Sequence, residues 1–267
     1  GEKTLERIIE QHKIDNEMEE FESKYKKSSI YKINQDITLW NGDCIELMSY
    51  IPNQSVDMIL CDLPYGLTWQ EWDSTINTNV LWSHYNRILK PKGAVLLFSS
   101  GVFTPKIINS NVENYKYSWY WIKNNKGNYL NAKNQPMRQV EMINVFNNHN
   151  YYPQGLKEHG TKRGRGGGAK ITLQNYANEW YQEFTGYPSD VLYYDLDKSK
   201  LHPTQKPVDL LEYLIKTYTK EGMVVLDNTM GSGSTGVAAK NLNRKFIGIE
   251  LGEEYFNIAK KRMGEID

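Results

Sequence analysis

The residues best suited to chemistry form a short run, Asp62 to Tyr65, at the end of an apolar stretch that is predicted to be a strand. The run reads Asp-Leu-Pro-Tyr, so a carboxylate, a rigid turn and an aromatic ring follow the strand directly. Ligands of open α/β sheets bind at this carboxyl end of the strands. A carboxylate accepts hydrogen bonds from an amino group, and an aromatic ring stacks on a flat base. The run therefore predicts a site for the amino group of a planar ring that has been swung out of a nucleic acid.

A second motif lies far downstream, in a glycine-rich turn that follows a predicted strand and opens a predicted helix. Gly231, Gly233 and Gly236 match the pattern G-x-G-x-x-G, and Glu250 lies 19 residues after Gly231 at the end of the next strand. In dinucleotide-binding proteins such a turn approaches the cofactor, and an acid at this distance binds ribose hydroxyls. A glycine turn can be purely structural, but the strand-turn-helix context and Glu250 favour a nucleoside site.

The order of the two motifs argues against a simple dinucleotide-dependent oxidoreductase. Only 17 residues follow Glu250, so the remaining strands of the sheet must come from the N-terminal half of the chain. The substrate half then comes first and the nucleoside half last. Asp227 also lies four residues before the glycines. A carboxylate there repels phosphates and favours a positively charged or amine-bearing ligand.

Predicted strands and helices alternate along most of the chain, which favours an α/β sheet covered by helices on both faces. Strands are predicted at residues 37–40, 56–61, 94–98, 117–123, 140–147, 224–226 and 246–249. Helices are predicted at residues 43–50, 78–90, 207–218, 234–243 and 253–263. A further charged helix at residues 2–28 is interpreted as a packing arm or dimer element rather than a DNA contact.

The composition fits one large globular domain, or one domain with an inserted lobe. Of the 267 residues, 39% are apolar and 24% are charged, an ordinary globular balance. The 32 basic and 32 acidic residues cancel, which argues weakly against nucleic acid as a partner, although charge distribution matters more than the sum. The two cysteines predict no disulfide framework, and no apolar run approaches membrane-spanning length. We therefore expect a cytoplasmic protein.

Residues 148–200 differ from the rest of the chain because they are polar, aromatic and rich in glycine, with little periodicity. A basic loop at residues 162–170 would either follow nucleic acid phosphates or form a solvated linker. Its basic side chains are Lys162, Arg163, Arg165 and Lys170. Trp69 lies in a predicted loop after the first motif, where it forms the lip of the base pocket or packs against it.

Together, these motifs resemble those of the β group of amino-directed DNA methyltransferases, which use S-adenosylmethionine. Asp62 to Tyr65 resembles the catalytic motif D/N/S-P-P-Y/F/W, and residues 227–233 resemble the cofactor motif D-P-F-x-G-S-G. Residues 201–207 match the highly specific H-P-T-Q-K-P box. Residues 41–44 resemble the G-D-C/A stretch that precedes the catalytic strand.

The resemblance covers residues 37–147 and 201–264, with two departures from the family pattern. Leu63 stands where proline is usual, and residues 228–230 read Asn-Thr-Met where Pro-Phe-x is common. Met230 would replace an aromatic contact to the adenine of the cofactor with a softer one.

The resemblance implies that Asp62, Pro64 and Tyr65 are the catalytic residues. The Asp62 carboxylate and the Pro64 carbonyl would accept hydrogen bonds from the target amino group, while Tyr65 stacks on a flipped-out base. The methyl group would then pass directly to the nitrogen, without a covalent enzyme intermediate. These contacts do not use the side chain of Leu63, so the first departure is expected to be tolerated.

The resemblance also implies a Rossmann-like methyltransferase sheet, mostly parallel with one antiparallel strand, in a permuted motif order. Glu250 would bind the ribose hydroxyls and Asp43 the adenine amino group of the cofactor. Asp227 would hold the methionine end, with Thr204 and Lys206 near its carboxylate. The implied cofactor residues are Asp43, Cys44, Asp62, Thr204, Lys206, Asp227, Thr229, Met230, Gly231, Ser232, Gly233 and Glu250.

The motif positions divide the chain into four parts. We expect an N-terminal helical arm at residues 1–29 and a catalytic half at residues 30–147. A target-recognition insertion follows at residues 148–200, and a cofactor-binding half at residues 201–267. The insertion, where the target sequence would be read, contains the basic loop.

Asp62 favours N6 of adenine as the methyl acceptor, because N4-cytosine enzymes of the family more often carry serine there. An N4-cytosine enzyme and a catalytically silent DNA-binding subunit remain alternatives, and an RNA substrate stays open. The absence of a Pro-Cys motif argues against cytosine C5 methylation, and no histidine or cysteine spacing suggests a metal. The partners implied are double-stranded DNA, a second copy in a homodimer and a cognate restriction endonuclease, with no membrane. The setting would be a restriction-modification, phage or solitary modification system of a bacterial or phage-infected cell.

Overall fold

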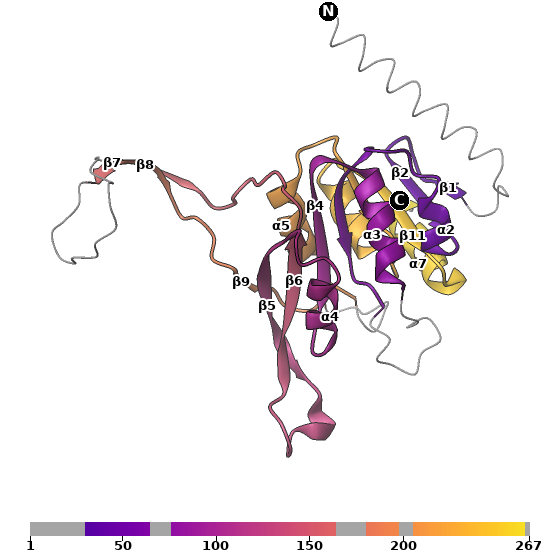
Figure 1. The fold of residues 1–267 in the computed structure, drawn as a ribbon, viewed down its shortest axis with the longest axis horizontal. Coiled ribbons are helices and arrows are strands. Elements are labelled where there is room, and N and C mark those ends of the chain that lie inside the picture. The colour runs from indigo at the N-terminus through magenta and orange to yellow at the C-terminus, as the bar shows by residue number, and fades with distance from the viewer. Residues whose placement is uncertain (1–29, 65–75, 164–179, 198–204, 265–267) are drawn as a thin grey trace, which may run out of the picture.

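Figure 1 shows the fold in a computed structural model, which describes residues 30–64, 76–163, 180–197 and 205–264. The helix predicted at residues 2–28 lies outside these ranges. Five predicted site residues also lie outside them: Tyr65, Trp69, Arg165, Lys170 and Thr204.

A nine-stranded mixed sheet forms the body of the described residues (Figure 1). Its strands, in spatial order, are β1 (Ile30–Lys32), β2 (Ile37–Asn41), β11 (Lys245–Glu250), β10 (Val224–Asp227), β3 (Val56–Cys61), β4 (Leu89–Ser99), β6 (Arg138–Phe146), β5 (Tyr115–Gly127) and β9 (Val191–Tyr193). All neighbours from β2 to β4 are parallel, whereas β6 is antiparallel to both β4 and β5. The predicted mostly parallel sheet with an antiparallel strand is confirmed, and β1 adds a second antiparallel strand at the edge.

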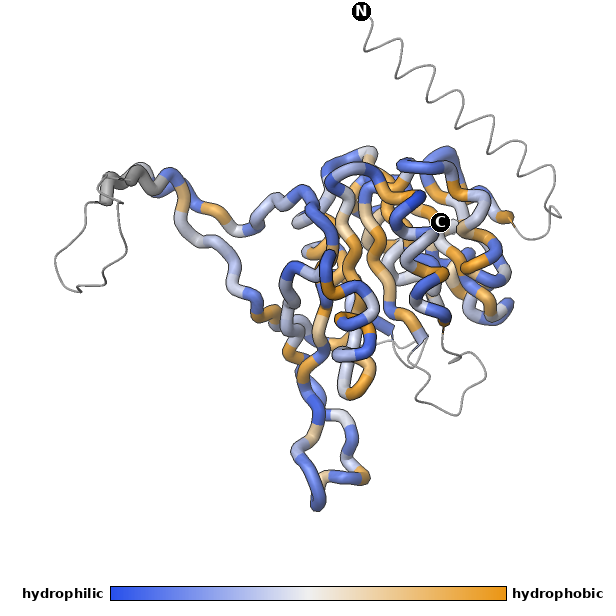
Figure 2. Tube along the Cα trace, in the orientation of Figure 1, coloured by the Kyte–Doolittle hydropathy of each residue, from blue (hydrophilic) through white to orange (hydrophobic). Residues whose placement is uncertain are grey.

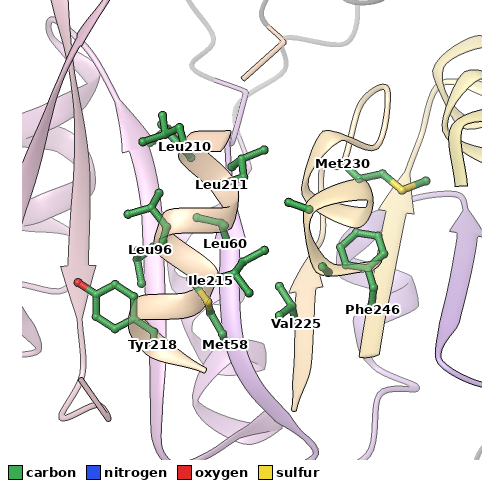
Figure 3. Close-up of a cluster of buried hydrophobic side chains, with 14 of the residues drawn as sticks. Met58, Leu60, Leu96, Leu210, Leu211, Ile215, Tyr218, Val225, Met230 and Phe246 are labelled. Carbon is green, nitrogen blue, oxygen red and sulfur yellow. The ribbon is translucent and has the colours of Figure 1, made fainter. Parts of the chain in front are cut away.

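Helices cover both faces of the sheet, as predicted. On one face lie α5 (Val208–Tyr218), α6 (Ser234–Asn241) and α7 (Glu253–Gly264), and on the other lie α2 (Cys44–Met48), α3 (Thr78–Ile88) and α4 (Phe103–Asn109). Each face has its own core of buried side chains, and Figure 3 shows the core between α5 and the strands. The central strands are therefore hydrophobic along their length, as Figure 2 shows.

Strand β3 illustrates how the two cores fix the position of the catalytic motif. Met58 and Leu60 belong to the core beneath α5, and Ile59 and Cys61 belong to the core beneath α3, because successive side chains point to opposite faces. Burial of each large apolar side chain contributes about 1.5–3 kcal/mol. A shift of one residue would exchange the two sets, so this packing holds Asp62 at the carboxyl end of the strand.

The two sequence motifs meet because β3 and β10 are neighbours in space. The chain leaves β3 through α3 toward β4, and it leaves β10 through α6 toward β11, on the opposite side. This divergence makes a crevice at the carboxyl ends of the two strands, the usual ligand site of open α/β sheets. The permuted order of the motifs thus still produces one site.

Four strands and one α-helix of the described residues were not predicted; one of these strands is β1, at the edge of the sheet. Strands β7 (Lys157–Arg163) and β8 (Trp180–Thr185) form a separate ribbon that projects from the body in Figure 1, and β9 lies at the edge of the main sheet. Strand β7 reads Lys-Glu-His-Gly-Thr-Lys-Arg. It has no apolar alternation, so only its pairing with β8 defines it as a strand. Helix α4 was missed because it is short and contains Pro105, a residue that disfavours helix interiors.

The predicted start of the basic loop at Lys162 is wrong. Lys162 and Arg163 belong to β7, where they pair with Tyr181 and Trp180 of β8. The cause is the aromatic-rich partner strand, which supplies backbone hydrogen bonds to a segment with no strand pattern of its own.

Candidate active site

A pocket of about 210 Å³ lies at the carboxyl ends of β2, β11, β10 and β3. Its lining includes Asp43, Cys44, Asp62, Pro64, Lys206, Asp227, Thr229, Met230, Gly231, Ser232 and Glu250, all predicted from the sequence. Other lining residues were not assigned a role there, among them Ile76, Phe98, Asn228, Thr235, Leu251 and Tyr255. The structure thus brings the catalytic motif and the cofactor motif to one cavity.

Asp62 is held in place by an ion pair with Lys206. The Lys206 ammonium donates to Oδ2 of Asp62 and also lies 5.0 Å from the centre of the Phe98 ring. The backbone carbonyl of Asp62 accepts a hydrogen bond of 3.2 Å from the Thr229 hydroxyl. Both the side chain and the backbone of Asp62 are therefore fixed by residues of the C-terminal half.

Two further residues, Glu141 and Lys123, extend this ion pair, and neither was predicted as a site residue. The Lys206 ammonium lies 3.4 Å from Oε2 of Glu141 on β6, and Oε1 of Glu141 accepts from Lys123 of β5 at 2.7 Å. We call Asp62, Lys206, Glu141 and Lys123 the charge chain. It contains two carboxylates and two ammonium groups in alternation, so its charges balance.

Burial and charge act against each other in the charge chain, and charge prevails. Burial alone would lower the pKa of Lys206, but the carboxylates of Asp62 and Glu141 outweigh it and raise that pKa. Burial alone would raise the pKa of Glu141, but Lys206 and Lys123 outweigh it and lower that pKa. Both groups therefore stay charged across the neutral pH range.

A signal for Glu141 was present in the sequence. It is the one charged residue of the strand segment 140–146, which is apolar apart from Asn144 and is buried from Ile143 to Phe146. A carboxylate in that position needs a cation. The sequence could not say which lysine supplies it, because that depends on β6 lying beside β4.

Asp227, the last residue of β10, accepts hydrogen bonds from uncharged donors among the described residues. Its Oδ1 accepts from the Thr229 backbone N–H at 3.1 Å, and its Oδ2 accepts from the Thr235 hydroxyl at 2.6 Å. Burial raises the pKa of Asp227 to about 7, although both hydrogen bonds act in the other direction. A cation bound nearby would favour its ionised form.

Glu250 ties the end of β11 to the glycine turn. Its Oε2 accepts from the Gly231 N–H and its Oε1 from the Gly252 N–H, both at 2.8 Å. Burial raises the pKa of Glu250. Gly233 also has a structural role, and its predicted contact with the cofactor stays a prediction. It caps α6 at φ 80°, and a Cβ there would lie 2.7 Å from Met263 Cε, so this glycine allows α7 to approach.

Asp43 and Cys44 lie at the start of α2. Oδ1 of Asp43 caps this helix by accepting from the backbone N–H groups of Ile45 and Glu46, at 2.9 and 3.1 Å. Burial raises the pKa of the Cys44 thiol to about 11, so this cysteine is a packing residue rather than a nucleophile.

Asn228 replaces the family's usual proline and joins a buried polar cluster. Its Oδ1 accepts from the Tyr85 hydroxyl at 2.6 Å and from the Cys61 thiol at 2.8 Å. The backbone N–H of Asn228, which proline lacks, donates to Cys61 Sγ at 3.4 Å. This departure from the family pattern therefore has partners of its own on β3 and α3.

The family model for DNA methylases of the N6 and N4 type matches residues 56–261. The chain belongs to this DNA methylase family. The predicted family, the Rossmann-like fold and the transfer of methyl groups to DNA are thus confirmed.

Two of the three similar proteins described here span most of this DNA methylase, and the third matches a short segment. The type II methyltransferase M.HinfI of Haemophilus influenzae is 29% identical over 260 residues, which cover 86% of this chain and 68% of the relative. The type II methyltransferase M2.DpnII of Streptococcus pneumoniae is 58% identical over 62 residues, 23% of each protein. The crystal structure of M1.HpyAVI with S-adenosylmethionine matches with a TM-score of 0.58 and 28% identity, and covers 85% of this chain and 99% of that one.

The pocket of this DNA methylase suits S-adenosylmethionine. Its lining contains the carboxylates of Asp43, Asp62, Asp227 and Glu250, while Lys206 is the one basic side chain among the described lining residues. This excess of acid fits a sulfonium and an amine better than phosphates. Apolar side chains also line the pocket and fit a nucleoside: Ile76, Phe98, Leu211, Met230 and Tyr255.

No group of three or more His, Cys, Asp or Glu residues in the described ranges could hold a metal ion. No helix in the same part of the chain is long and apolar enough to cross a membrane.

Proposed function

We propose that this DNA methylase transfers the methyl group of S-adenosylmethionine to N6 of an adenine flipped out of a specific duplex sequence. The observation that carries this proposal is the placement of Asp62 at the rim of the cofactor pocket, with its carboxylate held by Lys206. A serine, which the N4-cytosine enzymes more often have here, could not form that ion pair. The charge chain therefore supports the adenine assignment over its cytosine alternative.

The proposed chemistry follows from what Asp62 and Pro64 can accept. The lone pair of an adenine amino nitrogen is delocalised into the ring, so the nitrogen is a poor nucleophile. The Asp62 carboxylate and the Pro64 carbonyl accept its two hydrogens, which turns the lone pair out of the ring. S-adenosylmethionine supplies an electrophilic methyl group on its sulfonium. As the new N–C bond forms and the S–C bond breaks, Asp62 takes the proton that the nitrogen must lose.

The cofactor contacts are proposed from the same geometry. Glu250 would bind the ribose hydroxyls, Asp43 the adenine amino group and Asp227 the amine of the methionine end. Contact of Lys206 with the methionine carboxylate stays a prediction, and the pairing of its ammonium with Asp62 gives this lysine a second role. Residues 148–200, with the β7–β8 ribbon, would read the target sequence.

The wider setting is proposed from the family resemblance. We expect a homodimer with a cognate restriction endonuclease, in the cytoplasm of a bacterial or phage-infected cell. The target base would reach the pocket by leaving the duplex.

The test is the identity of the methylated base. The protein is incubated with unmethylated DNA and S-adenosylmethionine, the DNA is digested to nucleosides, and methylated nucleosides are quantified by mass spectrometry. Asp62→Asn tests the catalytic carboxylate, and Asp209→Asn, on the exposed first turn of α5, is the matched control.

We expect N6-methyladenine from the wild-type and Asp209→Asn proteins and none from Asp62→Asn. N4-methylcytosine would contradict the adenine assignment. Equal activity of Asp62→Asn would contradict the role of the carboxylate.

A further inference from the structure

The hairpin between β5 and β6 has no assigned role. Its outer part, residues 124–138, includes a short 3-10 helix, η1 (Tyr129–Asn131), at its tip. We call residues 124–138 the tip hairpin. Figure 1 shows it projecting well beyond the sheet at the lower edge of the view, and Figure 2 shows that it is mostly hydrophilic.

The composition of the tip hairpin is one-sided. Its 15 residues contain three basic side chains, Lys126, Lys133 and Arg138, and no acidic one, in a chain whose net charge is zero. It also contains six side-chain amides, at positions 124, 125, 128, 131, 134 and 135. Basic side chains neutralise phosphates, and Asn and Gln amides bond base edges in DNA grooves.

The tip also exposes two large apolar side chains next to each other. Tyr129 is 77% exposed and Leu130 is 96% exposed. Folding gains nothing from an apolar side chain in water, so a pair of this kind at a projecting tip indicates a contact with a partner. Apolar wedges between bases are a common feature of proteins that distort DNA.

The tip hairpin rises from the catalytic site itself. β5 is antiparallel to β6, which is antiparallel to β4, so β5 ends at the same edge of the sheet as β3 and Asp62. The stem of the hairpin holds Lys123 and Glu141 of the charge chain. Four extended residues beyond Lys123, up to Gly127, carry the tip roughly 13 Å from the charge chain before η1 begins.

From these observations we propose that the tip hairpin is a DNA-contacting element that engages the duplex beside the flipped base. Lys126, Lys133 and Arg138 bind phosphates, and Tyr129 and Leu130 pack against the bases. The inference rests on the proposed duplex substrate. The tip hairpin would contact DNA next to the catalytic carboxylate, in addition to the contact expected from residues 148–200.

The phosphate contacts are tested by the salt dependence of binding. The probe is a fluorescein-labelled DNA duplex of mixed sequence, titrated with the full-length protein at several salt concentrations and followed by fluorescence anisotropy. Lys126→Ala combined with Lys133→Ala removes two proposed contacts. Lys220→Ala combined with Lys245→Ala removes the same charge from exposed lysines at the opposite, amino edge of the sheet.

We expect the slope of log Kd against log salt to fall by about 2 in the hairpin variant, since each lost phosphate contact removes roughly 0.9. The control variant should keep the wild-type slope. S-adenosylmethionine binding, measured by calorimetry, should be unchanged in both. Equal slopes in the hairpin and control variants would overturn the proposal while leaving the proposed function intact. Failure of the wild-type protein to bind any duplex would contradict both.

The apolar contact is tested separately. Tyr129→Ala combined with Leu130→Ala should weaken duplex binding about tenfold at fixed salt, within the range for a lost base stack. Val112→Ala, an exposed apolar residue before β5, is the control and should bind as the wild type does. Wild-type duplex affinity together with a loss of self-association in sedimentation would reassign the tip to a second copy of the chain and overturn the proposal.

Discussion

The two halves of the pocket hold their carboxylates in different ways. In the cofactor half, Asp227 and Glu250 accept hydrogen bonds only from hydroxyl and backbone N–H groups in the contacts described above, and burial raises the pKa of both. In the catalytic half, Asp62 and Glu141 share the ammonium of Lys206. The carboxylates of the cofactor half can therefore pair with a cationic group of the ligand. In the catalytic half, the protein itself supplies the cation, Lys206.

The difference suits the two tasks. A buried carboxylate without a cation gains most when a positively charged ligand arrives, which favours binding of the sulfonium and amine. A catalytic hydrogen-bond acceptor must be oriented before the substrate arrives, because reorganisation during the reaction would cost rate. A paired carboxylate meets that need.

Removal of the shared cation should have the largest effect. Lys206→Met leaves the partly buried Asp62 without its cation and Glu141 with Lys123 alone, so it should lower the free energy of unfolding by about 3 kcal/mol. Methyl transfer should fall at least as strongly. Urea unfolding and single-turnover assays measure the two effects. Adding Glu141→Gln to Lys206→Met should restore part of the stability, and a strictly additive double variant would contradict the charge chain.

In the cofactor half, the raised pKa of Asp227 should make the free energy of unfolding depend on pH. A carboxyl group whose pKa is raised in the folded state stabilises the fold at low pH, and that contribution is lost as pH rises from its ordinary value toward about 7. For Asp227 the loss is up to about 4 kcal/mol. Urea unfolding of the ligand-free protein at pH 5 and pH 8 measures the part that falls between these two pH values, about 3 kcal/mol. Asp227→Asn cannot titrate, so its stability should change less between the two pH values, and an identical change would refute the assignment.

Neutralising Glu141 tests whether this residue acts on Asp62 through Lys206. Glu141→Gln keeps the shape of the side chain but removes the second carboxylate from Lys206, so the ammonium is left to Asp62 alone and weakens it as an acceptor. We expect kcat to fall about tenfold, roughly 1.4 kcal/mol, with the KM for S-adenosylmethionine unchanged. Steady-state kinetics separate the two constants. An increase in KM at constant kcat would place Glu141 in cofactor binding instead.

The smallest effect is expected at the uncharged cluster around Asn228. Tyr85→Phe removes the 2.6 Å hydrogen bond to Asn228 Oδ1 but leaves the one from Cys61. Loss of one neutral hydrogen bond should lower the free energy of unfolding by about 1 kcal/mol, with little change in activity. Urea unfolding measures it, and a loss comparable to that of Lys206→Met would contradict this ranking of the charged and uncharged clusters.

The parts of the fold and site that depend on short sequence patterns, such as apolar runs and motif spacing, could be predicted from the sequence. The apolar run of β3 places Asp62 at the end of a strand. The glycines of the turn after β10 and Glu250 at the end of β11 lie at a characteristic spacing in the sequence. These signals are contained in short segments, so a single sequence displays them. The assignment of Asp62, Pro64, Asp227 and Glu250 to one pocket followed from the two motifs and their order.

The parts that depend on strand order could not be predicted. Lys206 meets Glu141 only because β6 lies beside β4, and Glu141 meets Lys123 only through the register of β5 and β6. The β7–β8 ribbon depends on mutual pairing rather than on apolar periodicity, which is why Lys162 and Arg163 were placed in a loop.

The most direct test compares the pH dependence of cofactor binding with that of the chemical step. The Kd for S-adenosylmethionine is measured by calorimetry between pH 6 and pH 8, around the titration of Asp227. The single-turnover rate constant of methyl transfer, at saturating cofactor and DNA, is measured over the same range. The account predicts that Kd falls as pH rises through about 7 while the rate constant stays level, because Lys206 and Glu141 keep their charges. A rate constant that rises through the same range while Kd stays constant would contradict it.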